Sequence, residues 1–160
     1  MELGVPETDI LISGDAPDKR HTRGESDFFI EMAREQGWTS AVVLTQPHQL
    51  LRAVLGTLKV MELQKYGMEV YGLAPSSTSW FEVVKGSQGM EAKPRFEHIA
   101  DELNRVSLYQ KKGDLVSAHD ALSYLRLREL GQLRLGHLDW GSQLYNLSLP
   151  DEVSMNQYSI

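Results

Sequence analysis

The sequence contains no cysteine among its 160 residues. Disulfides, thiolate metal sites, iron–sulfur clusters and cysteine nucleophiles are therefore excluded. It also lacks a long hydrophobic run, because the longest unbroken aliphatic stretch covers only residues 41–44. A membrane-spanning helix needs about 20 consecutive apolar residues, so we expect no membrane span.

Positive charge is scarce as well. Lys and Arg number 16 against 22 Asp and Glu, which gives a net charge of −6. A chain of this charge is a poor partner for nucleic acid or an anionic membrane surface, and we expect neither. The first six residues, Met-Glu-Leu-Gly-Val-Pro, include an acid and no apolar core of a secretory signal. The expected location is therefore the cytoplasm.

Three short apolar runs predict β-strands. They cover residues 9–13, 40–45 and 68–74. The first two have an unbroken apolar centre, which is typical of strands buried on both faces of a parallel sheet. Helical periodicity fills the intervals between them, and this alternation is typical of parallel strands joined by right-handed crossovers. We therefore expect an α/β fold, a Rossmann-like three-layer sandwich with a parallel sheet and further helices at the C-terminus.

Capping residues mark the expected helix boundaries. Thr22 and Glu25 have the spacing of a capping box at the start of the first helix, and Gly37 is suited to end it. Pro47 fits the first turn of the second helix. That helix should end near residues 66–67.

The second half of the chain predicts shorter and more helical elements. A short strand is expected at residues 80–84 and a helix at residues 94–110. Ser117 begins a further helix, with Leu122 and Leu125 facing the core.

Two segments that follow strands carry unusual polar residues. Ligands bind at the carboxyl ends of parallel strands. The first segment includes His21, Thr22, Arg23 and Glu25 beside a helix N-terminus, where an anion is favoured and a cation is not. An anion-binding site explains the cations there, and a solvated loop with a purely structural capping box is the alternative.

The second segment includes Thr45, His48 and Arg52. His48 and Arg52 are four residues apart, so they share one face of the second helix. The helix macrodipole does not favour Arg52 near this end, and a carboxylate or phosphate partner would explain it. Alternatively, His48 is a local cap and Arg52 pairs with an acid such as Glu25.

Familiar catalytic motifs are missing. The chain has no GxGxxG, no GxxxxGK[ST] and no GxSxG pattern. Its five histidines are too far apart for a local metal motif, and we expect no metal site. His98 and His119 are expected to be structural residues near helix surfaces. No cofactor is indicated.

Four motifs in order resemble a known bacterial family. They are Gly4-Val-Pro6, Asp9-Ile-Leu-Ile12, Thr22-Arg-x-Glu25 and Val42-Val-Leu-Thr45-x-x-His48-x-x-x-Arg52-Ala53. Their order is similar to the C-terminal half of the YdcF/SanA/ElyC-like domain, over about residues 4–74. The resemblance implies a phosphorylated or nucleotide-like ligand at the strand ends and a link to envelope metabolism.

The departures from that family also carry information. His21 stands where the family has asparagine, Gln46-Pro47 replaces Ser-Tyr, and the family's initial glycine-rich strand and loop have no counterpart. We therefore expect a partial α/β domain at residues 1–112 and a helical extension with a tail at residues 113–160. Exposed edges of a shortened sheet favour pairing with another chain, and a homodimer that completes the sheet is one hypothesis.

Two functions follow as hypotheses. In the first, the domain binds a phosphorylated or nucleotide-like small molecule, with Arg52 clamping the anion and His48 as a donor or catalytic acid–base. In the second, the chain is a non-catalytic interaction module that has lost its active half. Whether it is an enzyme stays open.

Overall fold

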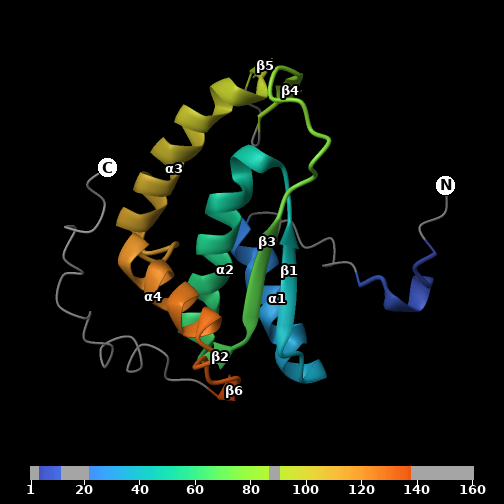
Figure 1. Ribbon diagram of the computed structural model, residues 1–160, viewed down its shortest axis with the longest axis vertical. Helices are drawn as coiled ribbons and strands as arrows, with labels where there is room; N and C mark the ends of the chain where they lie inside the picture. Colours follow the sequence, from blue (N-terminus) through green and yellow to red (C-terminus); the bar gives the residue numbers. More distant parts are fainter. Residues whose placement is uncertain (1–3, 12–21, 87–90, 138–160) are drawn as a thin grey trace, which may run out of the picture.

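The computed structural model describes residues 4–11, 22–86 and 91–137. Helix α2 lies at the centre, with strands β1 and β3 on one side and helices α3 and α4 on the other (Figure 1). The elements, in chain order, are η1 Glu7–Asp9, α1 Thr22–Gln36, β1 Ser40–Leu44, η3 Pro47–Gln49, α2 Leu50–Gln64, β2 Tyr66–Gly67, β3 Glu69–Leu73, β4 Val83–Lys85, β5 Ala92–Pro94, η5 Arg95–Glu97, α3 His98–Lys112, α4 Ala118–Glu129 and β6 Gly136–His137.

Strands β1 and β3 form a parallel pair around the α2 connection, with Ala41 opposite Val70. This confirms the α/β class and the strands expected at residues 40–45 and 68–74. The helix approaches the sheet closely at Gly72, where an added Cβ would lie 3.2 Å from the Val54 side chain. The core lies between α2, α1, the inner sheet face and α4. Its fully buried members include Ile30, Leu58, Met61, Met68, Val70 and Tyr124.

The prediction of a strand at residues 9–13 is wrong for residues 9–11, the part of it that the structure describes. Asp9 ends a short 3-10 helix in which its N–H donates to the Pro6 carbonyl. Ile10 and Leu11 follow outside any strand and are 53% and 55% exposed. A short apolar run does not fix a strand unless a neighbouring strand pairs with it. The remaining residues of this prediction, Ile12 and Ser13, lie outside the described part of the chain.

Only one face of the parallel sheet is covered in the described residues. Ala41 and Val43 pack against the helical core. The opposite face carries Val42, Leu44, Tyr71 and Leu73, which are all exposed. The described chain therefore forms a small parallel sheet with helices, and the expected three-layer sandwich is not confirmed.

The helix boundaries largely follow the capping signals. Helix α1 begins at Thr22, and Gly37 follows it with a φ of 66°. The side-chain contacts of a capping box at Thr22 lie outside what the structure describes. Pro47 begins a single 3-10 turn that leads into α2.

Helix α4 turns inward only one of the two leucines expected there. Leu125 is half-buried and packs against the core, whereas Leu122 is 67% exposed. The buried residues of the helix are Ala121, Tyr124 and Leu127. The Tyr124 hydroxyl explains this orientation, because it accepts from the Val70 N–H at 2.6 Å and donates to the Met68 carbonyl at 2.9 Å. These hydrogen bonds hold α4 against strand β3.

Helix α4 also closes the outer edge of β3. The Arg128 guanidinium donates to the Val70 carbonyl at 2.5 Å, on the side of β3 that faces away from β1. Together with Tyr124, it satisfies backbone groups that a further strand would otherwise use. Burial raises the pKa of Tyr124 to about 12, so its hydroxyl keeps its proton across the physiological range.

The strand expected at residues 80–84 is displaced along the chain. Strand β4 spans Val83–Lys85 and pairs with β5 in an antiparallel hairpin. Trp80 lies in the turn before it and contributes to the pocket described below.

We expect Ser117→Ala to lower the free energy of unfolding by about 1 kcal/mol. The Ser117 hydroxyl accepts from the Asp120 N–H at 3.0 Å and caps α4 as its sequence spacing predicts. Urea denaturation measures the loss. Ser107→Ala, at an exposed position within α3, is the matched control and should not destabilise the protein. Equal stability of both variants would contradict the capping role.

Candidate functional site

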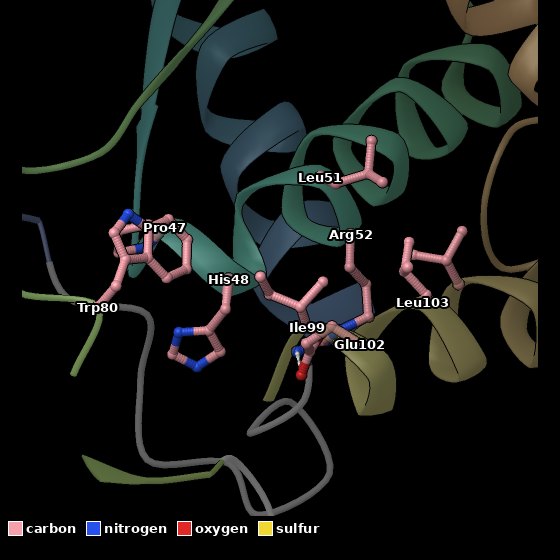
Figure 2. Close-up of a pocket in the computed structure, with 9 residues that line it drawn as sticks. Pro47, His48, Leu51, Arg52, Trp80, Ile99, Glu102 and Leu103 are labelled. Atoms are coloured by element: carbon pink, nitrogen blue, oxygen red, sulfur yellow. Dashed lines mark hydrogen bonds and ion pairs between the residues drawn. The ribbon is translucent and has the colours of Figure 1, made fainter. Parts of the chain in front are cut away.

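A pocket of about 210 Å³ lies between the start of α2 and helix α3. It is close to the carboxyl end of β1, where α/β sheets bind ligands. Its walls are mostly apolar, with one imidazole and one ion pair (Figure 2). The lining residues are Pro47, His48, Leu51, Arg52, Trp80, Ile99, Glu102, Leu103 and Val106.

His48 is the most unusual group in this pocket. Its side chain is only 7% exposed, and neither ring nitrogen has a hydrogen-bond partner among the described residues. The ring stacks on His98, with 5.2 Å between the centroids, and in Figure 2 it lies between Trp80 and Ile99. An unpaired buried polar group costs free energy. A ligand in the pocket that hydrogen-bonds to the ring would remove that cost.

The surroundings keep the His48 ring neutral. Burial lowers the pKa of His48 below its ordinary value of 6.5, and electrostatic interactions with His98, Arg95 and Arg52 lower it further against the opposing effect of Glu102. A neutral imidazole has one N–H donor and one acceptor nitrogen. His48 can therefore donate one hydrogen bond to a ligand and accept another.

Arg52 is held in a buried ion pair on the pocket wall. Its Nε lies 2.6 Å from Oε2 of Glu102, and the two side chains are only 7% and 6% exposed. Arg105 contacts the other carboxylate oxygen of Glu102 at 3.0 Å. The acid suggested by the sequence, Glu25, is not the partner of Arg52. A ligand anion at Arg52 would share it with Glu102, whose contact with Arg105 would remain.

Sequence reasoning missed the contribution of α3. His98 is buried rather than superficial, and its Nε2 lies 3.1 Å from the Val84 carbonyl. Both segments carry a histidine followed four residues later by a charged residue: His48 and Arg52 where η3 leads into α2, and His98 and Glu102 on α3. The two histidines stack on each other, and the two charged residues form the ion pair. This matched spacing, with opposite charges at the second position, was the available signal.

The other predicted site residues do not join this pocket. Glu25 and Thr45 line a second pocket, of about 290 Å³, between α1, β1 and α2. Arg23 binds Asp114 at 2.6 Å. Thr22 begins α1, and His21 lies outside the described residues. The structure therefore brings His48 and Arg52 together, and separately Glu25 and Thr45.

The described residues include neither a candidate metal site nor a candidate membrane-spanning helix. Across residues 4–11, 22–86 and 91–137, no three histidine, aspartate or glutamate side chains are grouped in a way that could hold a metal ion. Within the same ranges, no helix has the length and apolar character needed to span a membrane.

Comparison with known proteins gives no relative from which a function could be transferred. No protein-family model, no curated protein and no solved structure matches the chain at a significant level. The likeness to the YdcF/SanA/ElyC-like domain therefore stays a prediction from its sequence motifs.

Proposed function

We propose that the chain binds a small molecule in the pocket between α2 and α3. The observation that carries this proposal is His48, which is buried against the pocket with both ring nitrogens unpaired among the described residues. The ligand presents a polar or anionic group to His48 and Arg52. Its apolar part lies against Trp80 and Leu51.

The size and lining of the pocket limit the ligand. A volume of about 210 Å³ is below the roughly 300 Å³ at which sites for drug-sized ligands begin. The pocket therefore suits a small organic acid, or the phosphate end of a phosphorylated or nucleotide-like molecule that extends outside. Arg52 favours a negative group, because guanidinium pairs well with carboxylate and phosphate.

The proposal is one of binding and leaves catalysis aside. General acid–base catalysis by His48 needs a reacting group whose proton it can move. The described side chains that line the pocket offer no serine, threonine or lysine nucleophile. In this proposal His48 is a hydrogen-bonding group for the ligand.

A thermal-shift screen with His48→Leu tests the proposal. The ligands are inorganic phosphate, small carboxylates, sugar phosphates, nucleotides and S-adenosylmethionine. A ligand at ~100 times its dissociation constant adds roughly 2.7 kcal/mol to the free energy of unfolding. We expect His48→Leu to remove that shift, because leucine fills the site without its nitrogens. The unliganded variant should unfold within about 1 kcal/mol of the wild type, since His48 has no hydrogen bond to lose among the residues that the structure describes.

His119→Leu is the matched control, because His119 is an exposed histidine on α4. It should keep the full ligand-induced shift. The proposal fails if His48→Leu keeps it too, or if no compound in the screen stabilises a wild-type protein that melts cooperatively.

An interaction module is the second candidate. The exposed apolar face formed by Val42, Leu44, Tyr71 and Leu73 favours it, because contiguous exposed apolar surface often marks a contact with another macromolecule.

A further inference from the structure

The outer edge of β1 is open. The Thr45 N–H donates to the Leu73 carbonyl and the Glu69 N–H to the Thr39 carbonyl, so the odd-numbered residues of this strand face β3. Backbone groups alternate in direction along a strand. Those of Ser40, Val42 and Leu44 therefore face away from β3, and no described strand pairs with them.

The two edges of the sheet differ in their protection. On β3, Tyr124 and Arg128 bind the outward backbone groups of Val70 and the carbonyl of Met68. On β1, the usual protective features of an edge are missing: residues 39–49 include no Lys, Arg, Asp or Glu, and the strand itself has no proline. Val42 and Leu44 on this strand are 60% and 64% exposed.

A pocket of about 290 Å³ lies beside this edge, between α1, β1 and α2. It is lined by Glu25 and Phe29 of α1 and by Val42 and Leu44 of β1. Two strands are also the smallest number that a sheet can have, and sheets most often have about four to six. The open edge therefore favours pairing of β1 with a strand outside the described arrangement.

We propose that the strand is β1 of a second copy of this chain. The two strands run antiparallel about a two-fold axis at Val42, so that Val42 faces Val42 of the second copy and Ser40 faces Leu44. The outward groups then exchange N–H···O hydrogen bonds in pairs. The product is a four-stranded sheet in the order β3, β1, β1, β3.

The uncharged edge is where a second copy can approach. The chain has a net charge of −6, so two copies repel over most of their surfaces. Residues 39–49 are uncharged and form a stretch along which identical chains can approach. The apolar residues Ile10 and Leu11 of the same chain leave this edge open and are themselves exposed.

Disulfide trapping tests the pairing directly, because the wild-type chain has no cysteine. Opposed residues of a hydrogen-bonded antiparallel pair have Cα atoms about 5.5 Å apart, within the roughly 4.4–6.8 Å range of disulfides. Val42→Cys should therefore give a covalent dimer on a non-reducing gel. Tyr71→Cys is the control, because Tyr71 lies on the same sheet face as Val42 but on β3. Three strand spacings of about 4.8 Å would separate the two cysteines in the dimer, so this variant should run as a monomer on the gel.

A charge at the edge gives an independent test. Val42→Lys places two ammonium groups across the axis and should raise the dimer dissociation constant about tenfold or more in sedimentation equilibrium, whereas Tyr71→Lys should change it little. The proposal is overturned if the wild type is monomeric at high concentration. Equal cross-linking through Tyr71→Cys overturns it in favour of face-to-face packing. An intramolecular disulfide in the double variant Ile10→Cys/Val42→Cys overturns it, because the chain's own N-terminal residues would then pair with β1.

Discussion

Glu102→Ala should lower the free energy of unfolding by about 3–5 kcal/mol. The substitution leaves the buried Arg52 guanidinium without the carboxylate that lies 2.6 Å from its Nε. It also removes the negative charge that separates Arg52 from Arg105. Removing one partner of a buried ion pair is costly, because the remaining charge has been taken out of water without compensation. Urea denaturation followed by circular dichroism measures the loss.

Removing the other partner of the ion pair should lower the free energy of unfolding by less. The difference between the two variants is the sharper test. Arg52→Met leaves Glu102 in contact with Arg105, so the buried carboxylate keeps a positive neighbour. Lys59→Met is the control for a more exposed ion pair, that of Lys59 with Glu62, whose side chains are 21% and 37% exposed, and should change stability by less than about 1 kcal/mol. If Arg52→Met destabilises the protein more than Glu102→Ala, the contact between Glu102 and Arg105 does not compensate as described.

Tyr124→Phe should cost about 2–4 kcal/mol, because it leaves two buried backbone groups without the partner they now have. They are the Val70 N–H and the Met68 carbonyl, both bound by the Tyr124 hydroxyl. The ring itself is retained, so the loss reports these hydrogen bonds rather than packing. Hydrogen exchange at the Val70 amide should accelerate along with the global destabilisation seen in urea.

Tyr71→Phe is the matched control for this substitution. The Tyr71 hydroxyl is exposed and contacts only the Glu69 carboxylate among the described hydrogen bonds, so its removal should change stability by less than about 0.5 kcal/mol. Unchanged protection of the Val70 amide in Tyr124→Phe would contradict the role of Tyr124 at this edge.

Local sequence signals predicted the elements that depend on local physics. The uninterrupted apolar run of β1 and the Ser117 cap of α4 each lie within a few residues of sequence, and both are confirmed. Hydrophobicity alone misplaced part of the buried face of α4, since leucine at position 122 is exposed while Tyr124 is inside. The deciding contact is a hydroxyl bonded to a strand more than fifty residues earlier, which no local pattern contains.

The candidate site shows the same limit. His48 and Arg52 were predicted to share a face of α2, and the structure brings both to one pocket. The partner of Arg52 could not be predicted, because Glu102 is fifty residues away on α3. The apolar run near residue 10 failed for a related reason: a strand is defined by its neighbour, and the described Ile10 and Leu11 have none.

The contacts of α4 with β3 bear on how far the assembly proposed above could grow. Open-ended fibres need sheets that accept strands at both sides, because each added copy must leave a new site for the next. Here Tyr124 and Arg128 bind backbone groups of Val70 and Met68 on one side. If two copies pair through β1, each presents a β3 edge that α4 partly covers, which disfavours the addition of a third. Loss of the α4 contacts would leave that edge open to further strands.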